Sequence, residues 1–136
     1  MPEQHVTSGD HVVLRLPASG AYLSVLRTAA AGLASRLDFT IDDIEDLKIA
    51  IDEACAMLLP RGVEGADLTC RFDLHDDVLD IAVSLATVDS TLPSRDTFAW
   101  TVLSALAGEV DATVEDGEIT IRLSKHREAL IEEVGV

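Results

Sequence analysis

The residue most open to a chemical interpretation is Glu53, in the segment 40–59, TIDDIEDLKIAIDEACAMLL. Apolar residues recur there at steps of three and four, which predicts an amphipathic helix. Glu53 lies four residues after Ile49 and four before Met57, so it shares a helix face with apolar side chains at the border of the buried stripe. A carboxylate at that border lies either at the rim of a cleft or at the end of the solvated face, and position alone favours the solvated face.

Other site chemistries have no matching pattern in the sequence. The histidines at 5, 11, 75 and 126 are scattered, and none pairs with another at metal-ligand spacing, so no metal site is expected. There is no G-x-S-x-G motif, and neither Cys55 nor Cys70 has a neighbouring histidine, so the sequence has no signature of a hydrolase. The two cysteines are expected to be reduced, buried thiols. A regulatory disulfide between them stays open.

The hydropathy pattern predicts the elements that must position Glu53. Strands are expected at 11–16, 68–74, 78–85, 109–114 and 118–123, further helices at 19–37 and 97–107, and a final helical turn or two within 125–134. Most of the strands are joined as hairpins and the helices are grouped. The sequence therefore predicts an α+β fold, a two-layer sandwich in which three helices cover one face of a mainly antiparallel sheet.

The same pattern assigns individual side chains on the helices. Thr40 is expected to cap the helix 40–59, and Ile41 to begin its buried stripe. The acids expected to face solvent on this helix are Asp42, Asp43, Glu45 and Asp46. The side chains expected to face inward on the helix 97–107 are Phe98, Val102, Leu103 and Leu106.

Length and charge limit the function classes. The 136 residues suffice for one domain, assigned to 11–126, with a flexible N-terminal tail at 1–10 and a C-terminal tail at 127–136. The formal net charge of −15 argues against a nucleic-acid surface, because phosphates would be repelled. A protein partner with a basic face is compatible with that charge. Without a signal-peptide pattern or an apolar run of membrane-spanning length, the chain is expected to be cytoplasmic.

Two stretches resemble the anti-sigma factor serine kinases of the RsbW type, which have the GHKL (Bergerat) ATPase fold of histidine kinases and gyrase. They are RLDFTIDDIEDLKIAIDEA at 36–54 and TIRLSKH at 120–126. The strand-helix-helix-hairpin order is also similar. The resemblance covers residues 11–126 and is weaker between 85 and 103.

The resemblance implies roles for the residues of the second predicted helix. Glu53 matches the family's catalytic base, which orients the attacking hydroxyl or water. The family's asparagine four residues later, which holds the Mg²⁺ that bridges the ATP phosphates, is Met57 here. A thioether is a poor ligand for a hard cation that prefers oxygen, so the resemblance implies a broken magnesium site.

The family's two glycine motifs are also missing. The adenine-reading D-x-G-x-G motif falls near Ser84, in SLATV at 84–88, and the phosphate-cradling G-x-G falls at Thr97 to Ala99. Glycine matters there because only a bare backbone approaches a phosphate closely. Three losses in one site predict that the chain binds neither ATP nor Mg²⁺ usefully, and that Phe98 and Trp100 fill part of the former pocket.

The partner-binding surface of the family is the part that the resemblance leaves intact. An exposed arginine on the family's first helix contacts the sigma factor and the competing anti-anti-sigma factor, and it aligns with Arg27, flanked by Ser24 and Thr28. The alternative interpretation of Arg27 is a solvated helix cation. Arginine offers a planar fork of donors suited to an acidic partner site, which favours the functional interpretation.

The leading hypothesis is therefore a cytoplasmic anti-sigma factor of stress-response type. It would sequester an RNA polymerase sigma factor, be antagonised by a STAS-type anti-anti-sigma factor, form a homodimer and work without ATP hydrolysis. Two alternatives stay open. One is an active serine kinase that phosphorylates the anti-anti-sigma factor with Glu53 as base, and the other is an adaptor for an unrelated regulator.

Overall fold

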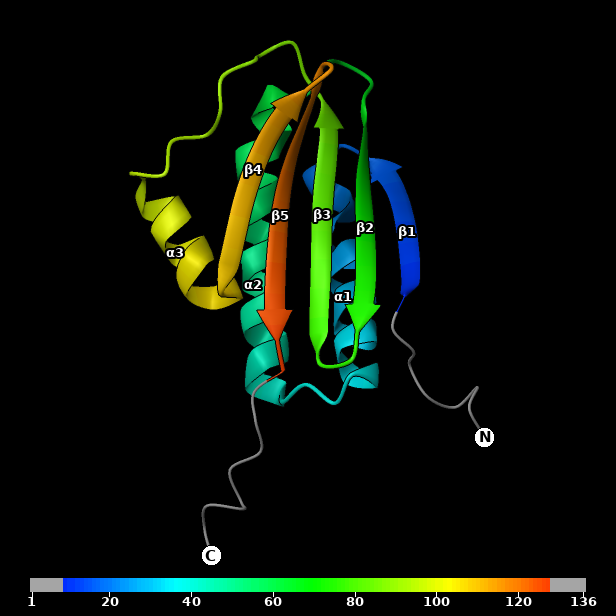
Figure 1. Cartoon of the computed structure of the whole chain (residues 1–136). Helices are drawn as coiled ribbons and strands as arrows, with labels where there is room; N and C mark the ends of the chain where they lie inside the picture. Colours follow the sequence, from blue (N-terminus) through cyan, green and yellow to red (C-terminus); the bar gives the residue numbers. More distant parts are fainter. Residues whose placement is uncertain (1–8, 128–136) are drawn as a thin grey trace, which may run out of the picture.

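The computed structural model describes residues 9–127 (Figure 1). In chain order the elements are β1 Asp10–Pro17, the 3-10 turn η2 Gly20–Tyr22, α1 Leu23–Arg36, α2 Ile41–Leu58, the 3-10 turn η3 Leu59–Arg61, β2 Asp67–His75, β3 Val78–Ala86, α3 Phe98–Ala107, β4 Glu109–Glu115 and β5 Glu118–His126. The expected strand and helix order is confirmed. The expected first helix begins as a 3-10 turn, because the Ser19 hydroxyl accepts a hydrogen bond from the Ala21 amide.

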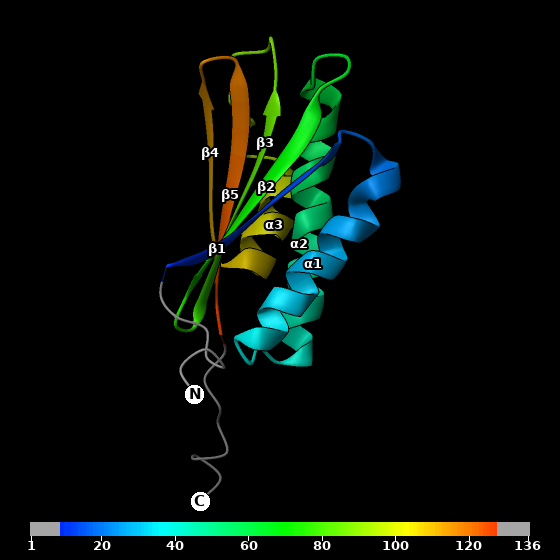
Figure 2. The same ribbon diagram turned by 90° about the vertical axis from the view of Figure 1, so that its right-hand side faces the viewer.

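The five strands form one antiparallel sheet in the order β1-β2-β3-β5-β4. Figure 2 shows all three α-helices on one face of this sheet, while the other face carries no element of residues 9–127. Alternate strand residues turn toward the helices and are buried, among them Cys70, Phe72, Ile81 and Ile121. The predicted α+β two-layer sandwich is therefore confirmed.

The start of α2 differs from the expected pattern in two side chains. Thr40 caps the helix as expected, because its Oγ1 accepts a hydrogen bond from the Asp43 amide at 3.1 Å. Asp43 is buried, however, and Ile41 is 78% exposed, so both assignments were wrong. The buried stripe runs through Leu47 and Ala50, and Asp43 lies one turn before Leu47. Ile41 lies two residues earlier, about 200° around the helix from Asp43.

The start of α3 also differs from the pattern of buried residues expected from the sequence. Trp100, Leu103 and Ala107 are buried, whereas Phe98 is 83% exposed. Phe98 was expected to face inward and to fill part of a former pocket, and that expectation was wrong. Phe98 lies two positions before Trp100, about 200° around the helix, so the two rings leave the helix on opposite sides. Burying the larger indole ring turns Phe98 outward.

The last strand is longer than expected. β5 continues to His126, so residues 125 and 126 extend the sheet and do not begin a helical turn. Arg127 closes this end of the fold by donating its amide to the Asp77 carbonyl at 2.7 Å. The rest of the expected helical turn, at 128–134, lies outside the described residues. No helix within residues 9–127 is long and apolar enough to cross a membrane.

Candidate functional site

The first candidate site lies along α2, where Glu53 and Met57 are one helical turn apart. Both side chains are half-buried, and each is followed by a buried residue of the same helix, Ala54 and Leu58. Glu53 is thus at the border of the buried stripe, as its spacing predicted. A carboxylate and a thioether at this separation provide one oxygen ligand group and one soft sulfur, which is a poor donor set for Mg²⁺.

The N-terminus of α3 is closed by its own side chain. The Thr97 Oγ1 accepts a hydrogen bond from the Trp100 amide at 3.1 Å, and the Thr97 carbonyl accepts from the Thr101 amide at 3.1 Å. Ala99 adds a half-buried methyl group to the same turn. Helix N-termini bind phosphates through free amides, and Thr97 occupies one of the first-turn amides of α3.

The segment between β3 and α3 is also tied to the rest of the chain. The Asp89 amide donates to Thr87 Oγ1 at 3.0 Å, and the Thr91 amide donates to Asp89 Oδ1 at 2.9 Å. Arg61, just after α2, donates to the Thr91 carbonyl, and its Nη1 lies 3.7 Å from Asp89 Oδ2. Hydrogen bonds from the Thr91 side chain and amide, together with Arg61, hold the pKa of Asp89 below its ordinary value. The amides of Asp89 and Thr91 are therefore engaged within this segment.

Ser84, where the resemblance placed the adenine reader, is not brought near Glu53. Its neighbours Val83 and Leu85 are buried toward the helices, so Ser84 lies on the open face of the sheet. Its hydroxyl forms a 2.8 Å hydrogen bond with Thr120 Oγ1 of β5. The structure thus separates the expected nucleotide positions: Glu53, Met57, Thr97 and Ala99 belong to the helix layer, and Ser84 belongs to the opposite face of the sheet.

The second candidate site is the surface shared by α1 and α2. Arg27 of α1 donates from Nη1 to Asp52 Oδ1 of α2 at 2.7 Å. The Arg27 side chain is 32% exposed and that of Asp52 is 43% exposed. Ser24, about one turn before Arg27 on α1, and Thr28, the residue after Arg27, are exposed as expected. Arg27 is therefore an accessible cation that already has an acidic partner, which the sequence pattern of α1 alone did not indicate.

A buried ion pair joins three elements and was missed by the sequence reasoning. Lys125 Nζ of β5 donates to the Leu106 carbonyl at 2.8 Å and lies 3.7 Å from Asp43 Oδ1 of α2. The two side chains are 14% and 10% exposed. A signal was present, because Lys125 continues the inward-facing alternation of Ile121 and Leu123. The pair lies at the opposite end of α2 from Glu53 and Met57, so it is a structural contact.

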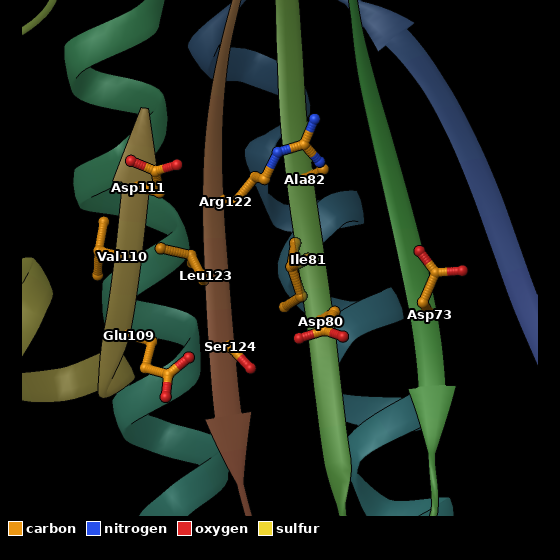
Figure 3. Close-up of a pocket in the computed structure, with 10 residues that line it drawn as sticks. All are labelled: Asp73, Asp80, Ile81, Ala82, Glu109, Val110, Asp111, Arg122, Leu123 and Ser124. Atoms are coloured by element: carbon orange, nitrogen blue, oxygen red, sulfur yellow. The ribbon is translucent and has the colours of Figure 1, made fainter. Parts of the chain in front are cut away.

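The open face of the sheet carries a hollow of about 480 Å³ that the sequence did not predict (Figure 3). Figure 3 shows Arg122 of β5 beside Ala82 of β3, with acidic side chains around them. The acids that line the hollow are Asp73, Asp80, Glu109 and Asp111. Arg95 donates to Asp111 at 2.8 Å and lies over the Trp100 ring at 4.8 Å from its centroid. That hydrogen bond holds the pKa of Asp111 below its ordinary value.

Both cysteines are buried core residues. Burial raises the pKa of Cys55 to about 12, with a smaller contribution from the Asp52 carboxylate, and burial raises the pKa of Cys70 as well. Thiols in this state are protonated at neutral pH and react poorly with oxidants. Cys55 lies on α2 and Cys70 on β2, and both belong to the same apolar core.

Comparison with known proteins gives relatives named serine-protein kinase RsbW. No protein-family model matches the chain. It is 36% identical over 81 residues to the serine-protein kinase RsbW of Bacillus velezensis, a match over 57% of this chain and 51% of that protein. It is 32% identical over 80 residues to the serine-protein kinase RsbW of Bacillus subtilis, over 57% and 50% of the two chains. The chain thus spans about half the length of these curated relatives.

A solved structure has the same fold. The crystal structure of the RsbU and RsbW domains of a Mycobacterium tuberculosis protein matches with a TM-score of 0.69 over 89% of this chain and 33% of that one. The sequence identity is 16%, so this likeness concerns the arrangement of the helices and the sheet. It agrees with the five-stranded sheet and the helix layer of residues 9–127.

Proposed function

Because this chain is a sequence relative of the RsbW serine-protein kinases and has an RsbW-like fold, we propose that it is an anti-sigma factor that acts by protein-protein binding. It sequesters an RNA polymerase sigma factor in the cytoplasm and releases it when a STAS-type anti-anti-sigma factor competes. Neither step requires ATP hydrolysis in this proposal, since sequestration needs only a surface that the polymerase cannot reach at the same time.

One observation carries this proposal: three backbone amides at and before the N-terminus of α3, where the resemblance places the phosphates, are engaged within the chain. Thr97 binds the Trp100 amide, and the amides of Asp89 and Thr91 bind side-chain oxygens of their own segment. Met57 supplies sulfur where the family has an oxygen ligand. These features support the absence of ATP and Mg²⁺ as working cofactors.

The proposed binding surface is the exposed part of α1 around Arg27, with Ser24 and Thr28 beside it. The Asp52 carboxylate holds one end of the Arg27 guanidinium at 2.7 Å, and the remaining donors of the fork stay available to an acidic group of the partner. Asp52 thereby orients the arginine. An acidic side chain of a sigma factor or of the antagonist would share or replace this contact.

The first experiment is titration calorimetry of the full chain with Mg·ATP and with Mg·ADP. We expect no heat of binding at nucleotide concentrations in the millimolar range. Clear binding would contradict the proposal and move the kinase to first place. The variant Met57→Asn is a useful companion, because it restores the metal-ligand type but leaves Thr97 and Ala99 in place of glycines, and it is also expected to show no binding.

The second experiment measures affinity for purified sigma factors and STAS proteins. Arg27→Ala is expected to weaken binding about tenfold or more, an amount typical of losing a charge-assisted contact at an interface. Arg36→Ala is the matched control, because Arg36 is an exposed arginine on the same helix. Equal affinities for wild type and Arg27→Ala would exclude this surface. Recovery of no sigma factor at all would favour an adaptor for another regulator.

A second candidate function, serine kinase activity on the anti-anti-sigma factor, is favoured by one observation. Glu53 is retained at the position of the family base and is half-buried on α2. Transfer of labelled phosphate from ATP to a STAS partner would establish it, provided that Glu53→Ala abolishes the transfer. Asp46→Ala, at a half-buried acid two turns earlier on α2, is the control for general effects of charge removal.

We also propose that the chain forms a homodimer, as the resemblance implies.

A further inference from the structure

The contact between Arg27 and Asp52 joins the proposed partner-binding helix to its neighbour. Figure 2 shows α1 and α2 side by side in the helix layer, and Arg27 Nη1 donates to Asp52 Oδ1 across this junction at 2.7 Å. Within residues 9–127 no other hydrogen bond reaches either side chain. Because both side chains are partly exposed, the second Asp52 oxygen and the remaining guanidinium donors are open to a partner.

This ion pair lies close to the buried core. Burial, and to a smaller extent the Asp52 carboxylate, raises the pKa of the Cys55 thiol, while the Arg27 guanidinium lowers it. Both charges therefore act on a group that is completely buried. A partner that covered the pair would remove its remaining water, and a charge without water is costly when it has no partner of opposite sign.

An acid of the partner does not by itself complement this surface. If a carboxylate of the partner took over Arg27, Asp52 would remain as an unpaired charge at a closed interface. The lysine of α2, Lys48, lies one turn before Asp52 but is held by Glu45 at 3.1 Å, so it is not free to compensate. A partner that supplied its own cation to Asp52 would avoid the cost of the unpaired carboxylate.

We propose that Arg27 and Asp52 form a two-charge recognition site, which selects partners that present an acid to Arg27 and a lysine or arginine to Asp52. This inference rests on the proposed function and specifies the chemistry of the partner at the same surface. Each charge of the pair then keeps a partner of opposite sign when the interface closes. A helix of the partner provides this arrangement when its acid and its base are three or four positions apart. The required cation also suits a chain with a net charge of −15.

Two other roles of Asp52 lead to different expectations for the variant Asp52→Asn. Asparagine has nearly the shape of aspartate, and its side-chain oxygen can accept the same hydrogen bond from Arg27 without carrying a charge. If Asp52 only orients Arg27, this variant should bind the partner as tightly as the wild type does. If Asp52 competes with the partner's acid for Arg27, the variant should bind more tightly. Only a carboxylate that pairs with a cation of the partner gives weaker binding when its charge is removed.

Titration calorimetry of the full chain with a sigma factor that binds the wild type tests the recognition site. Asp52→Asn is expected to weaken binding about fivefold, the upper range for a partly exposed ion pair, and Asp52→Glu to stay within about twofold of the wild type because it keeps the charge. The matched control is Asp46→Asn, which removes the same charge from a half-buried acid on the same helix. Its affinity should change by less than about twofold, because solvent and salt screen a charge outside the contact.

Unchanged or tighter binding by Asp52→Asn would overturn the two-charge site, and so would an equal loss of affinity in Asp46→Asn. Arg27→Ala, measured beside these variants, separates such a failure from failure of the proposed function. If Arg27→Ala weakens binding and Asp52→Asn does not, the surface around Arg27 stands and only the role of Asp52 is wrong. If Arg27→Ala binds as the wild type does, or the chain binds neither a sigma factor nor a STAS protein, the proposed surface and the two-charge site both fail.

Discussion

At the scale of single residues, burial decides the chemistry of the two thiols. Desolvation raises the pKa of Cys55 to about 12 and raises that of Cys70 as well, since a thiolate is poorly stabilised in an apolar core. We expect both thiols of the native protein to be unreactive toward Ellman's reagent at pH 8 and to react completely in denaturant. The reaction rate should therefore report opening of the core. Rapid labelling of either thiol without denaturant would contradict this and support a redox role.

A second prediction at this scale concerns Asp73, whose carboxylate receives two hydrogen bonds from Arg71 at 2.9 and 3.0 Å. These bonds hold the pKa of Asp73 below its ordinary value of 3.8. The native state thus binds the proton less readily than the unfolded state, and the stabilisation is present above pH 3.8 and is lost as the pH falls through the native pKa.

We therefore expect Asp73→Asn to lower the free energy of unfolding at pH 7 by about 0.5 kcal/mol, a small effect because the pair is largely exposed. The difference from wild type should close as the pH falls below the ordinary pKa of aspartic acid. Urea unfolding of both proteins from pH 7 to pH 3 measures this difference in the free energy of unfolding. Asp46→Asn, which removes a half-buried acid of α2, is the control. A difference that grows on acidification would refute the assignment.

At the scale of elements, the pair formed by Lys125 and Asp43 joins β5, α2 and the end of α3. Removing one partner leaves the other charge in a site that is mostly closed to water. We expect Lys125→Met to lower the free energy of unfolding by about 2–3 kcal/mol, and the double variant Lys125→Met, Asp43→Leu to recover part of that loss. Lys48→Met, at a half-buried lysine whose partner Glu45 is exposed, should cost less than about 0.5 kcal/mol.

Chemical denaturation of the four proteins checks this prediction. The double variant also removes the acid that follows the Thr40 cap, so its recovery is expected to be incomplete. Equal stability of Lys125→Met and wild type would show that the contact does not hold the three elements together.

The strands and helices also show how much of the fold could be predicted from the sequence. Period-two and period-3.6 patterns identified every strand and α-helix, because burial alternates strictly along β2 and β3 and the α2 stripe repeats through Leu47, Ile51, Ala54 and Leu58. The errors in side-chain orientation lie at helix starts, at Ile41, Asp43 and Phe98, and one error in element type lies at residues 125 and 126, which extend β5. A periodic pattern at a helix start has no preceding turn to fix its phase, so the neighbouring sheet decides which side is buried.

The candidate site was less predictable than the fold. The resemblance located Glu53, Met57 and Arg27 on the correct helices, since these positions follow from helical spacing. It did not locate the contacts that determine how such residues act. Arg27 meets Asp52 from 25 positions away, and Arg61 meets Asp89 across the gap between α2 and the segment after β3. Pairings of that kind depend on how α1 packs on α2 and on where the chain leaves β3, which local patterns do not specify.

At the scale of the whole molecule, the net charge of −15 acts on both proposed associations, but in opposite directions. Two identical copies repel each other at long range, while a sigma factor with a basic face is attracted. Salt screens both effects, since the Debye length falls from about 30 Å at 0.01 M to about 8 Å at 0.15 M. Raising the salt concentration should therefore tighten the homodimer and weaken sigma-factor binding.

Sedimentation measures the affinity of the homodimer, and calorimetry measures the affinity for the sigma factor. Both are measured over the same series of salt concentrations. Arg27 is partly buried beside Asp52, so the contribution of Arg27 to sigma-factor affinity should persist at high salt, when the long-range attraction has been screened. A homodimer that weakens with salt would contradict this prediction, because it would require an interface held by ion pairs.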